Sequence, residues 1–196
     1  MTLIKSNFFV LTGGPGVGKT TLIRHLRAKG LTCVDETARA VIREQIASGG
    51  TAVPWGDTQA YFETVARRDV AIFDAMVDET APVLFDRNVV DAACWALAEN
   101  IATPPDLIEA LAARRCNPMV FVAPPWPEIY ETDDERRQTW AEAEATFPRV
   151  MTALVALGYQ PVMLPCVSVA ERAAFVQEKM AEASGAQVST KARSRT

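Results

Sequence analysis

Short apolar runs alternate with amphipathic segments along most of the chain. Five runs of about four residues are typical of buried strands, over residues 8–11, 31–34, 82–85, 119–122 and 161–164. The segment after the first run repeats apolar residues at Leu22, Ile23 and Leu26, which is helical spacing. Strands that alternate with helices predict an α/β fold of three layers around a mostly parallel five-stranded sheet.

Turn and capping residues mark the ends of the predicted helices. We expect helices over about 20–27, 38–47, 58–79, 90–99, 106–115 and 169–180, the third of them capped by Asp57. A further charged helix should start near Asp133, with Pro148 interrupting it. The polar stretch 184–196 offers little to bury, so we predict one domain over 1–183 and a flexible tail over 184–196.

A glycine-rich motif lies between the first predicted strand and the first predicted helix. It reads Gly13-Gly14-Pro15-Gly16-Val17-Gly18-Lys19-Thr20, followed by Thr21, and matches a phosphate-binding loop (P-loop, Walker A). The glycines let backbone N–H groups point inward, and the helix start adds partial positive charge. Lys19 would bridge the β- and γ-phosphates of a nucleotide, and Thr20 would bind Mg²⁺. The motif predicts ATP and Mg²⁺ as cofactors.

Charged residues also follow the third predicted strand, where such sheets bind ligands. Asp86 comes directly after the apolar run and has the position of a carboxylate that holds Mg²⁺ or accepts a proton. Arg87 could reach a substrate or the transferred phosphoryl group. The simpler alternative is a helix-capping aspartate beside a surface arginine.

Glu36 and Arg39 follow the second predicted strand. A carboxylate there faces the acceptor side of a small kinase, where Glu36 could activate a substrate hydroxyl. Arg39 lies on the same helical face and could bind an anionic group of the substrate. The alternative, with equal support, is an ion pair within the helix.

Two arginines follow the fourth predicted strand, in the segment Asp133-Asp134-Glu135-Arg136-Arg137. Phosphotransferases of this build carry a mobile lid here, and Arg136 or Arg137 could close over the γ-phosphate. The alternative is a solvated helix start, which accounts for the acidic residues but not for the arginines.

The charge balance narrows the class of partners. A net charge of −4 and a pI near 5.1 argue against nucleic acid or an anionic membrane as the main partner. Four cysteines without metal-ligand spacing and one histidine argue against a zinc site. The polar amino terminus and the short apolar runs predict a soluble, cytoplasmic protein.

Four segments together, GGPGVGKTTLIRHL, VDETARAVIREQ, PVLFDRNVVD and VFVAPPWPEIYETDDERRQ, resemble the small AAA-domain "predicted ATPase" family of P-loop proteins. That family is similar to nucleoside and nucleotide kinases more than to ring-forming AAA+ machines. The resemblance places Glu36 and Arg39 in the Glu-x-Ala-Arg pattern of ribosylnicotinamide kinase domains. It likens Asp134 and Arg137 to their lid, and Asp86-Arg87 to the Asp-Arg pair of thymidylate kinases.

These features predict a Mg²⁺-dependent phosphotransferase that moves the γ-phosphoryl of ATP to a nucleoside, nucleotide or related small acceptor. Lys19, Glu36, Asp86 and Arg137 would be catalytic, Thr20 and Asp86 would hold the metal, and Glu36, Arg39 and Arg87 would bind the acceptor. Two alternatives stay open: a nucleotide-binding switch or weak ATPase that acts through a protein partner, and a polynucleotide 5′-kinase. The acceptor, the preference between ATP and GTP, and the oligomeric state are left open.

Overall fold

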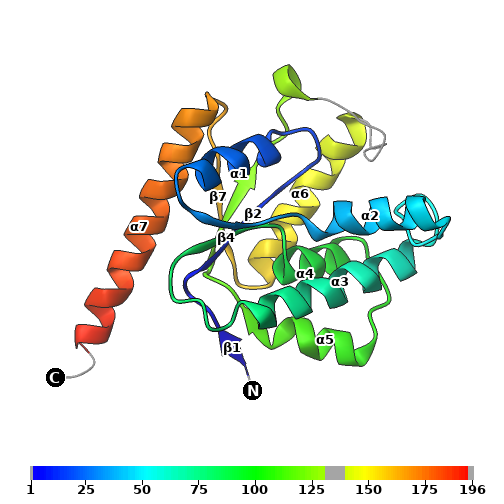
Figure 1. The fold of residues 1–196 in the computed structure, drawn as a ribbon, viewed down its shortest axis with the longest axis horizontal. Coiled ribbons are helices and arrows are strands. Elements are labelled where there is room, and N and C mark those ends of the chain that lie inside the picture. Colours follow the sequence, from blue (N-terminus) through cyan, green and yellow to red (C-terminus); the bar gives the residue numbers. More distant parts are fainter. Residues whose placement is uncertain (1, 131–139, 194–196) are drawn as a thin grey trace.

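A five-stranded parallel sheet forms the centre of the molecule (Figure 1). The computed structural model describes residues 2–130 and 140–193, with side chains through residue 185. The strand order is β3-β4-β2-β6-β7, and every neighbouring pair is parallel. The strands are β2 (Phe8–Gly13), β3 (Thr32–Val34), β4 (Val83–Asp86), β6 (Met119–Ala123) and β7 (Gln160–Met163). The predicted sheet is therefore confirmed, with β2 in its middle.

Helices cover both faces of the sheet, which gives the three predicted layers. On one face lie α1 (Lys19–Ala28) and α7 (Val169–Arg193). On the other lie α3 (Thr58–Ala75), α4 (Val89–Ala98), α5 (Pro105–Ala112) and α6 (Trp140–Ala156). Strand β2 alternates between the two cores, because Phe9 and Leu11 pack with α1 and α7 whereas Phe8 and Val10 pack with the other helices. All six residues of β2 are buried, as expected for a central parallel strand.

Helix α2 (Thr37–Ser48) lies outside these layers and packs against α3. Its apolar residues Val41 and Ile42 contact Tyr61 and Val65 of α3. A glycine ends α2, since Gly49 takes the left-handed conformation with φ 69°. The Asp57 side chain caps α3 by accepting a hydrogen bond from the Ala60 N–H at 2.9 Å.

The structure corrects three of the predicted boundaries. Helix α6 continues through the exposed Pro148, which therefore does not interrupt it. Helix α5 ends at Ala112, because the next residues form strand β5 (Arg114–Arg115), which pairs with β1 (Leu3–Ile4) in a separate two-stranded sheet. Helix α3 ends at Ala75, short of the expected end near residue 79. Two-residue strands are too short to produce a recognisable pattern of apolar residues.

The carboxyl-terminal helix is longer than its apolar pattern predicts. Helix α7 runs to Arg193 and so includes the backbone of residues 184–193. The boundary between domain and tail at residue 184 stays a prediction. Among the described helices, α7 included, none combines the length and the apolar character that crossing a membrane requires.

Candidate functional site

The P-loop connects the central strand β2 to helix α1. Strand β2 ends at Gly13, and α1 begins at Lys19 directly after Gly18, which has φ 76°. The Lys19 side chain is buried, and its Nζ donates to the carbonyl oxygens of Gly13 at 3.0 Å and Gly14 at 2.7 Å. Thr20 is partly exposed in the first turn of α1, and Thr21 is exposed. The arrangement of strand, loop and helix is the one on which the predicted phosphate site depends.

Helix α7 supports the P-loop from the side of α1. The Arg172 guanidinium is buried and donates from Nη2 to the Val17 carbonyl oxygen at 3.1 Å. It lies 5.6 Å from the centre of the Trp126 ring, and burial lowers its pKa. A Cβ on Gly18 would come within 3.0 Å of the same guanidinium. The sequence analysis did not identify Arg172, although an arginine on the apolar side of a helix is a signal that could have done so.

Asp86 and Thr20 fit a magnesium site. Asp86 ends β4, beside the P-loop strand, and its Oδ1 is buried with no hydrogen-bond partner in the described part of the chain. Burial raises the pKa of this carboxyl, and the nearby Lys19 opposes the rise. One carboxylate and one hydroxyl are the protein ligands that Mg²⁺ uses beside nucleotide phosphates, so the donor set suits the metal. The assignment of both residues as ligands stays a prediction.

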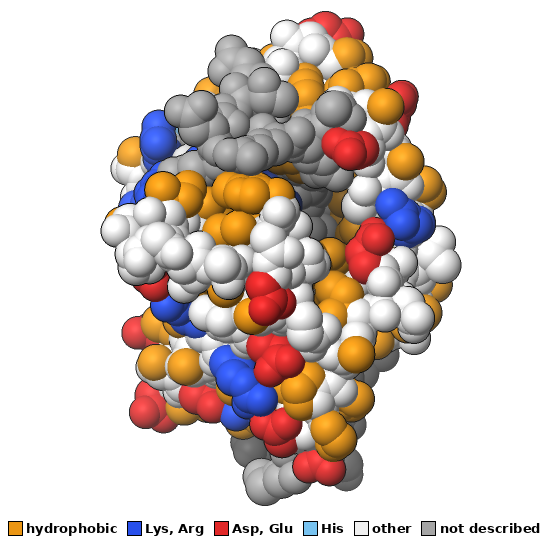
Figure 2. All heavy atoms as spheres, turned by 90° about the vertical axis from the view of Figure 1, so that its right-hand side faces the viewer, with side chains coloured by type: hydrophobic (Ala, Val, Ile, Leu, Met, Phe, Trp, Pro, Cys, Tyr) orange, Lys and Arg blue, Asp and Glu red, His pale blue; other side chains and the backbone are white. Residues whose placement is uncertain are grey.

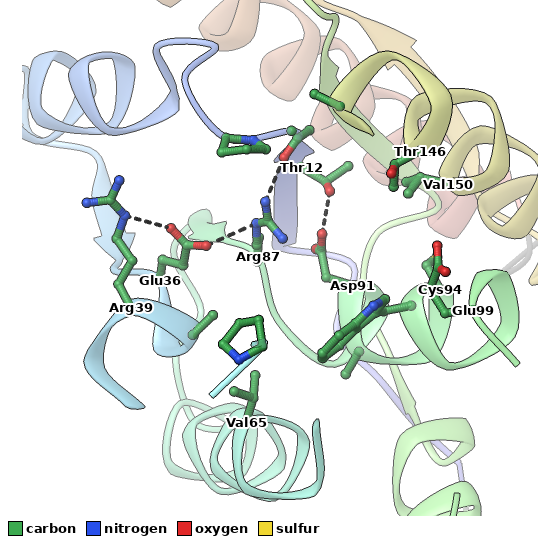
Figure 3. Close-up of a pocket in the computed structure, with 18 of the residues that line it drawn as sticks. Thr12, Glu36, Arg39, Val65, Arg87, Asp91, Cys94, Glu99, Thr146 and Val150 are labelled. Atoms are coloured by element: carbon green, nitrogen blue, oxygen red, sulfur yellow. Dashed lines mark hydrogen bonds and ion pairs between the residues drawn. The ribbon is translucent and has the colours of Figure 1, made fainter. Parts of the chain in front are cut away.

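Glu36, Arg39 and Arg87 lie together, as Figure 3 shows. The Glu36 carboxylate pairs with Arg87 Nε at 3.2 Å and with Arg39 Nε at 3.4 Å. Arg87 has φ 65°, and its Nη2 donates to the Gly13 carbonyl oxygen at 2.8 Å. The ion pair between Glu36 and Arg39 was one of the two alternatives drawn from the sequence, and here it forms part of a larger network. One guanidinium thus joins the P-loop backbone to the carboxylate after β3.

The sequence analysis missed a second carboxylate at the same place. Asp91, in the first turn of α4, accepts a hydrogen bond from the Thr12 hydroxyl, and Thr12 immediately precedes the P-loop (Figure 3). Burial raises the pKa of Asp91, whereas Arg87 and the hydrogen bond from Thr12 lower it. A signal was available, because Asp91 is the one charged residue in the apolar helix VVDAACWALA. The cap of α4 is Asn88, whose side chain accepts from the Val90 N–H at 2.9 Å, and not Asp86.

A cavity of about 880 Å³ opens beside the P-loop. Its lining includes Gly13, Gly14 and Lys19 at one end and side chains of α2, α3, α4 and α6 elsewhere. The apolar wall contains two aromatic rings in edge-to-face contact, Tyr61 and Trp95, with centres 5.6 Å apart. Figure 2 shows a hollow on the face that carries α2, α3 and α6, with hydrophobic side chains beside it. The volume is in the range of small-molecule binding sites.

The residues predicted to bind the acceptor line this cavity. Glu36, Arg39 and Arg87 are all part of its wall, together with Asp69 and Asp91, which the sequence did not single out. Burial raises the pKa of Asp69 to about 7, so this carboxyl is partly protonated at neutral pH. The structure therefore brings the predicted donor and acceptor residues to one site. Their individual roles stay predictions.

The predicted lid residues Asp133, Asp134, Arg136 and Arg137 lie outside the described residues. On either side of that segment, the Tyr130 and Trp140 rings make an edge-to-face contact with centres 5.2 Å apart. The proposed role of Arg136 or Arg137 as a lid residue therefore stays a prediction from the sequence.

The comparisons with solved structures show which fold this is. A thymidylate kinase from Candida albicans shares 13% identity, with 91% of this chain and 92% of that chain covered and a TM-score of 0.59. The NadR protein, in a structure with NR, shares 20% identity with a TM-score of 0.67, covering 92% of this chain and 52% of that one. This chain thus spans about half the length of NadR. A shikimate kinase from Acinetobacter baumannii shares 16% identity, with coverages of 89% and 93% and a TM-score of 0.53. The fold is that of the P-loop kinases.

The family comparison agrees with the resemblance found in the sequence. A comparison with curated proteins gives no match. A family model described as an AAA domain matches residues 8–172, from the first residue of β2 to Arg172 in α7, and so includes the P-loop and the described cavity wall. The chain belongs to this AAA-domain family of P-loop proteins.

Proposed function

We propose that the protein transfers the γ-phosphoryl group of ATP to a hydroxyl group of a small acceptor in a Mg²⁺-dependent reaction. One observation carries the proposal: the cavity of about 880 Å³ begins at Lys19 and the P-loop and is lined, at the same end, by Glu36 and Arg87. A second substrate bound there would lie next to the γ-phosphate. A switch or a simple ATPase needs only a water molecule next to the γ-phosphate, and its reaction does not require a large, partly apolar cavity there.

The proposed division of roles follows the positions of the side chains. Lys19 and the loop amides would hold the β- and γ-phosphates, and Thr20 and Asp86 would bind Mg²⁺, which neutralises charge on the phosphates. The acceptor oxygen would attack the γ-phosphorus while the bond from that phosphorus to the β–γ bridging oxygen breaks, and ADP leaves. Glu36 would accept the hydrogen bond, and then the proton, of the attacking hydroxyl. Arg87 would hold Glu36 and the P-loop in a fixed geometry.

Screening of acceptors by mass spectrometry tests the proposal. The full chain is incubated with ATP, Mg²⁺ and a library of nucleosides, nucleotides and small hydroxylated metabolites, and products heavier by one phosphoryl group are identified. Transfer should depend on Mg²⁺ and be abolished by Lys19→Ala. Glu36→Gln should lower kcat by about 100-fold or more, whereas Glu44→Gln, which changes an exposed pair with Arg68, should leave it unchanged. Slow ATP hydrolysis alone, equal in the wild type and in Glu36→Gln, would contradict the proposal and favour the switch or weak ATPase.

A further inference from the structure

The arginines of the cavity are already paired with carboxylates of the protein. Among the described lining residues, the guanidinium groups are those of Arg39, Arg87 and Arg149. Arg39 and Arg87 both pair with Glu36, and Arg149 pairs with Glu99 through Nη1 and Oε1 at 3.1 Å. Arg87 also donates to the Gly13 carbonyl oxygen. Each of these arginines is therefore already paired with a carboxylate of the protein itself.

The Glu36 network is the part that matters for a phosphate-bearing acceptor. A nucleoside monophosphate that is converted to a diphosphate receives the phosphoryl group on its existing phosphate, which then has to lie at the P-loop end of the cavity beside Glu36 and Arg87. The Glu36 side chain is only 12% exposed and that of Arg39 21% exposed. An acceptor phosphate at this place would compete with the Glu36 carboxylate for the same two guanidinium groups. The Arg87 side chain is 31% exposed, so the network is partly buried, and separating its charges costs more than it would at a fully exposed pair.

Carboxylates also outnumber the arginines among the described residues that line the cavity. The lining carboxylates are Glu36, Asp69, Asp91, Glu99 and Glu142. The fourth described cation of the lining, Lys19, lies over the P-loop, where the donor nucleotide's phosphates would bind. The acceptor region therefore has no excess of positive charge among the described residues. Even with Asp69 partly protonated, a phosphate dianion would meet carboxylates of like charge, whereas hydroxyl groups can donate hydrogen bonds to carboxylates.

The apolar part of the wall favours a flat ring. Trp95 contacts both Tyr61 and Phe62 edge to face, with ring centres 5.6 Å apart in each pair, so the indole is held in place. Ile42 and Val65 lie on the same wall, and Phe147 and Val150 of α6 belong to the lining as well. Rigid aromatic and aliphatic side chains of this kind bind a ring at a small cost in entropy.

We propose that the acceptor is a phosphate-free hydroxylated ring compound of the nucleoside class, and that the pairing of Arg39 and Arg87 with Glu36 excludes the corresponding monophosphate. This inference rests on the proposed phosphotransfer and narrows its acceptor. Glu36 has a second role here, because it occupies the guanidinium groups that would bind an acceptor phosphate. The Arg149–Glu99 pair does the same at a separate point of the wall.

Matched pairs of acceptors test the inference. Adenosine, guanosine, cytidine, uridine and thymidine are each compared with their 5′-monophosphates, and ribose with ribose 5-phosphate, by kcat/KM for phosphoryl transfer from MgATP. The phosphate-free member of a reactive pair should be favoured by about tenfold or more. Higher kcat/KM for the phosphorylated members would overturn the inference but leave the phosphotransfer standing. Transfer to neither member of any pair would overturn the inference, whereas the phosphotransfer itself would be overturned only if the wider acceptor library also gave no phosphorylated product.

Three glutamate variants test the cause of the discrimination through binding instead of turnover. Affinity for nucleoside monophosphates is measured by calorimetry in the presence of Mg²⁺ and a non-hydrolysable ATP analogue. Glu36→Gln should tighten monophosphate binding by about tenfold, since it removes the carboxylate charge that competes with the phosphate for Arg39 and Arg87. Glu99→Gln should give a smaller gain at Arg149, and Glu44→Gln, a matched change outside the cavity lining, should give none. Equal monophosphate affinity in the wild type and in Glu36→Gln would show that ion-paired arginines are not the cause and would overturn the inference.

Discussion

Gly13 lies where the central strand becomes the P-loop, and we expect Gly13→Ala to lower the free energy of unfolding strongly. The residue pairs with Ala123 across β2 and β6, and its φ is 133°. A Cβ added there would come within 3.0 Å of the Ala123 carbonyl oxygen, closer than real Cβ atoms come to other atoms. Because that oxygen belongs to the backbone of a buried strand, it cannot move aside as a flexible side chain would.

The expected cost has two parts. A non-glycine residue in a disfavoured backbone conformation costs about 1–3 kcal/mol. Overpacking against a rigid neighbour adds about 1–3 kcal/mol. We therefore expect Gly13→Ala to lower the free energy of unfolding by about 4 kcal/mol and Tm by about 10 °C. Nucleotide affinity should fall as well, since Lys19 and Arg87 both donate to the Gly13 carbonyl oxygen.

Two other glycines separate these contributions in urea-unfolding experiments. At Gly49 φ is 69°, but no atom lies within 4 Å of an added Cβ, so Gly49→Ala should cost about 1 kcal/mol from the backbone alone. At Gly14 the nearest atom to an added Cβ is Ala143 Cβ at 3.8 Å, an ordinary contact, so Gly14→Ala should change stability by less than about 0.5 kcal/mol. If Gly13→Ala costs no more than Gly49→Ala, the contact with Ala123 does not constrain the loop and this reasoning is wrong.

Three further substitutions test separate parts of the structure. Burial raises the pKa of Asp69 to about 7 from an ordinary 3.8, so the folded state holds a proton that the unfolded state releases between about pH 4 and pH 7, and stability falls as the pH rises through that window. Asp69→Asn should remove up to about 4 kcal/mol of this dependence, measured as the difference between wild-type and variant unfolding curves at pH 4 and pH 8, and parallel pH profiles would contradict it. Arg172→Met keeps most of the side-chain volume but loses the hydrogen bond to the Val17 carbonyl oxygen, so ATP affinity measured by calorimetry should fall about tenfold. An unchanged affinity would show that this hydrogen bond does not contribute to nucleotide binding. Pro148→Ala restores an N–H inside helix α6 at an exposed position and should stabilise the fold by about 1–3 kcal/mol, so a lower Tm would count against it.

The layered fold could be predicted from the sequence because its signals are local. Each main strand is a short apolar run that packs on both faces, as Phe8 to Leu11 do, and the helices between strands repeat their apolar residues at 3.6-residue spacing. Gly49 and Asp57 mark helix ends through their own backbone and side-chain chemistry. Pro148 misled the prediction, because a proline in a long helix is tolerated where tertiary packing, here through Ala153 and Leu154 of the same helix, holds the segment in place.

In the candidate site, too, the local features could be predicted from the sequence and the features that depend on packing could not. The P-loop is one continuous motif, so roles for Lys19 and Thr20 could be predicted from the sequence alone. The cavity wall is assembled from four separate helices, and only their packing brings Asp69 and Asp91 to the same cavity. The paired state of Arg87 could not be predicted either, since its partner Glu36 precedes it by 51 positions in the chain. A spacing pattern identifies residues that could be charged partners but not which partner each one has.

The strand order has a consequence for how this protein could be redesigned. The P-loop follows β2, the middle strand of the sheet. The side chains of β2 are packed in both hydrophobic cores, so a substitution in this strand disturbs the packing on both faces of the sheet. The cavity beside it is lined by side chains of α3, α4 and α6, which cover one face of the sheet, and of α2, which packs against α3. Substitutions at Trp95 or Phe147 should therefore change which molecules bind in the cavity while leaving the structure of the P-loop unchanged. Directed evolution of a new acceptor specificity should therefore begin on these helices and leave β2 unchanged.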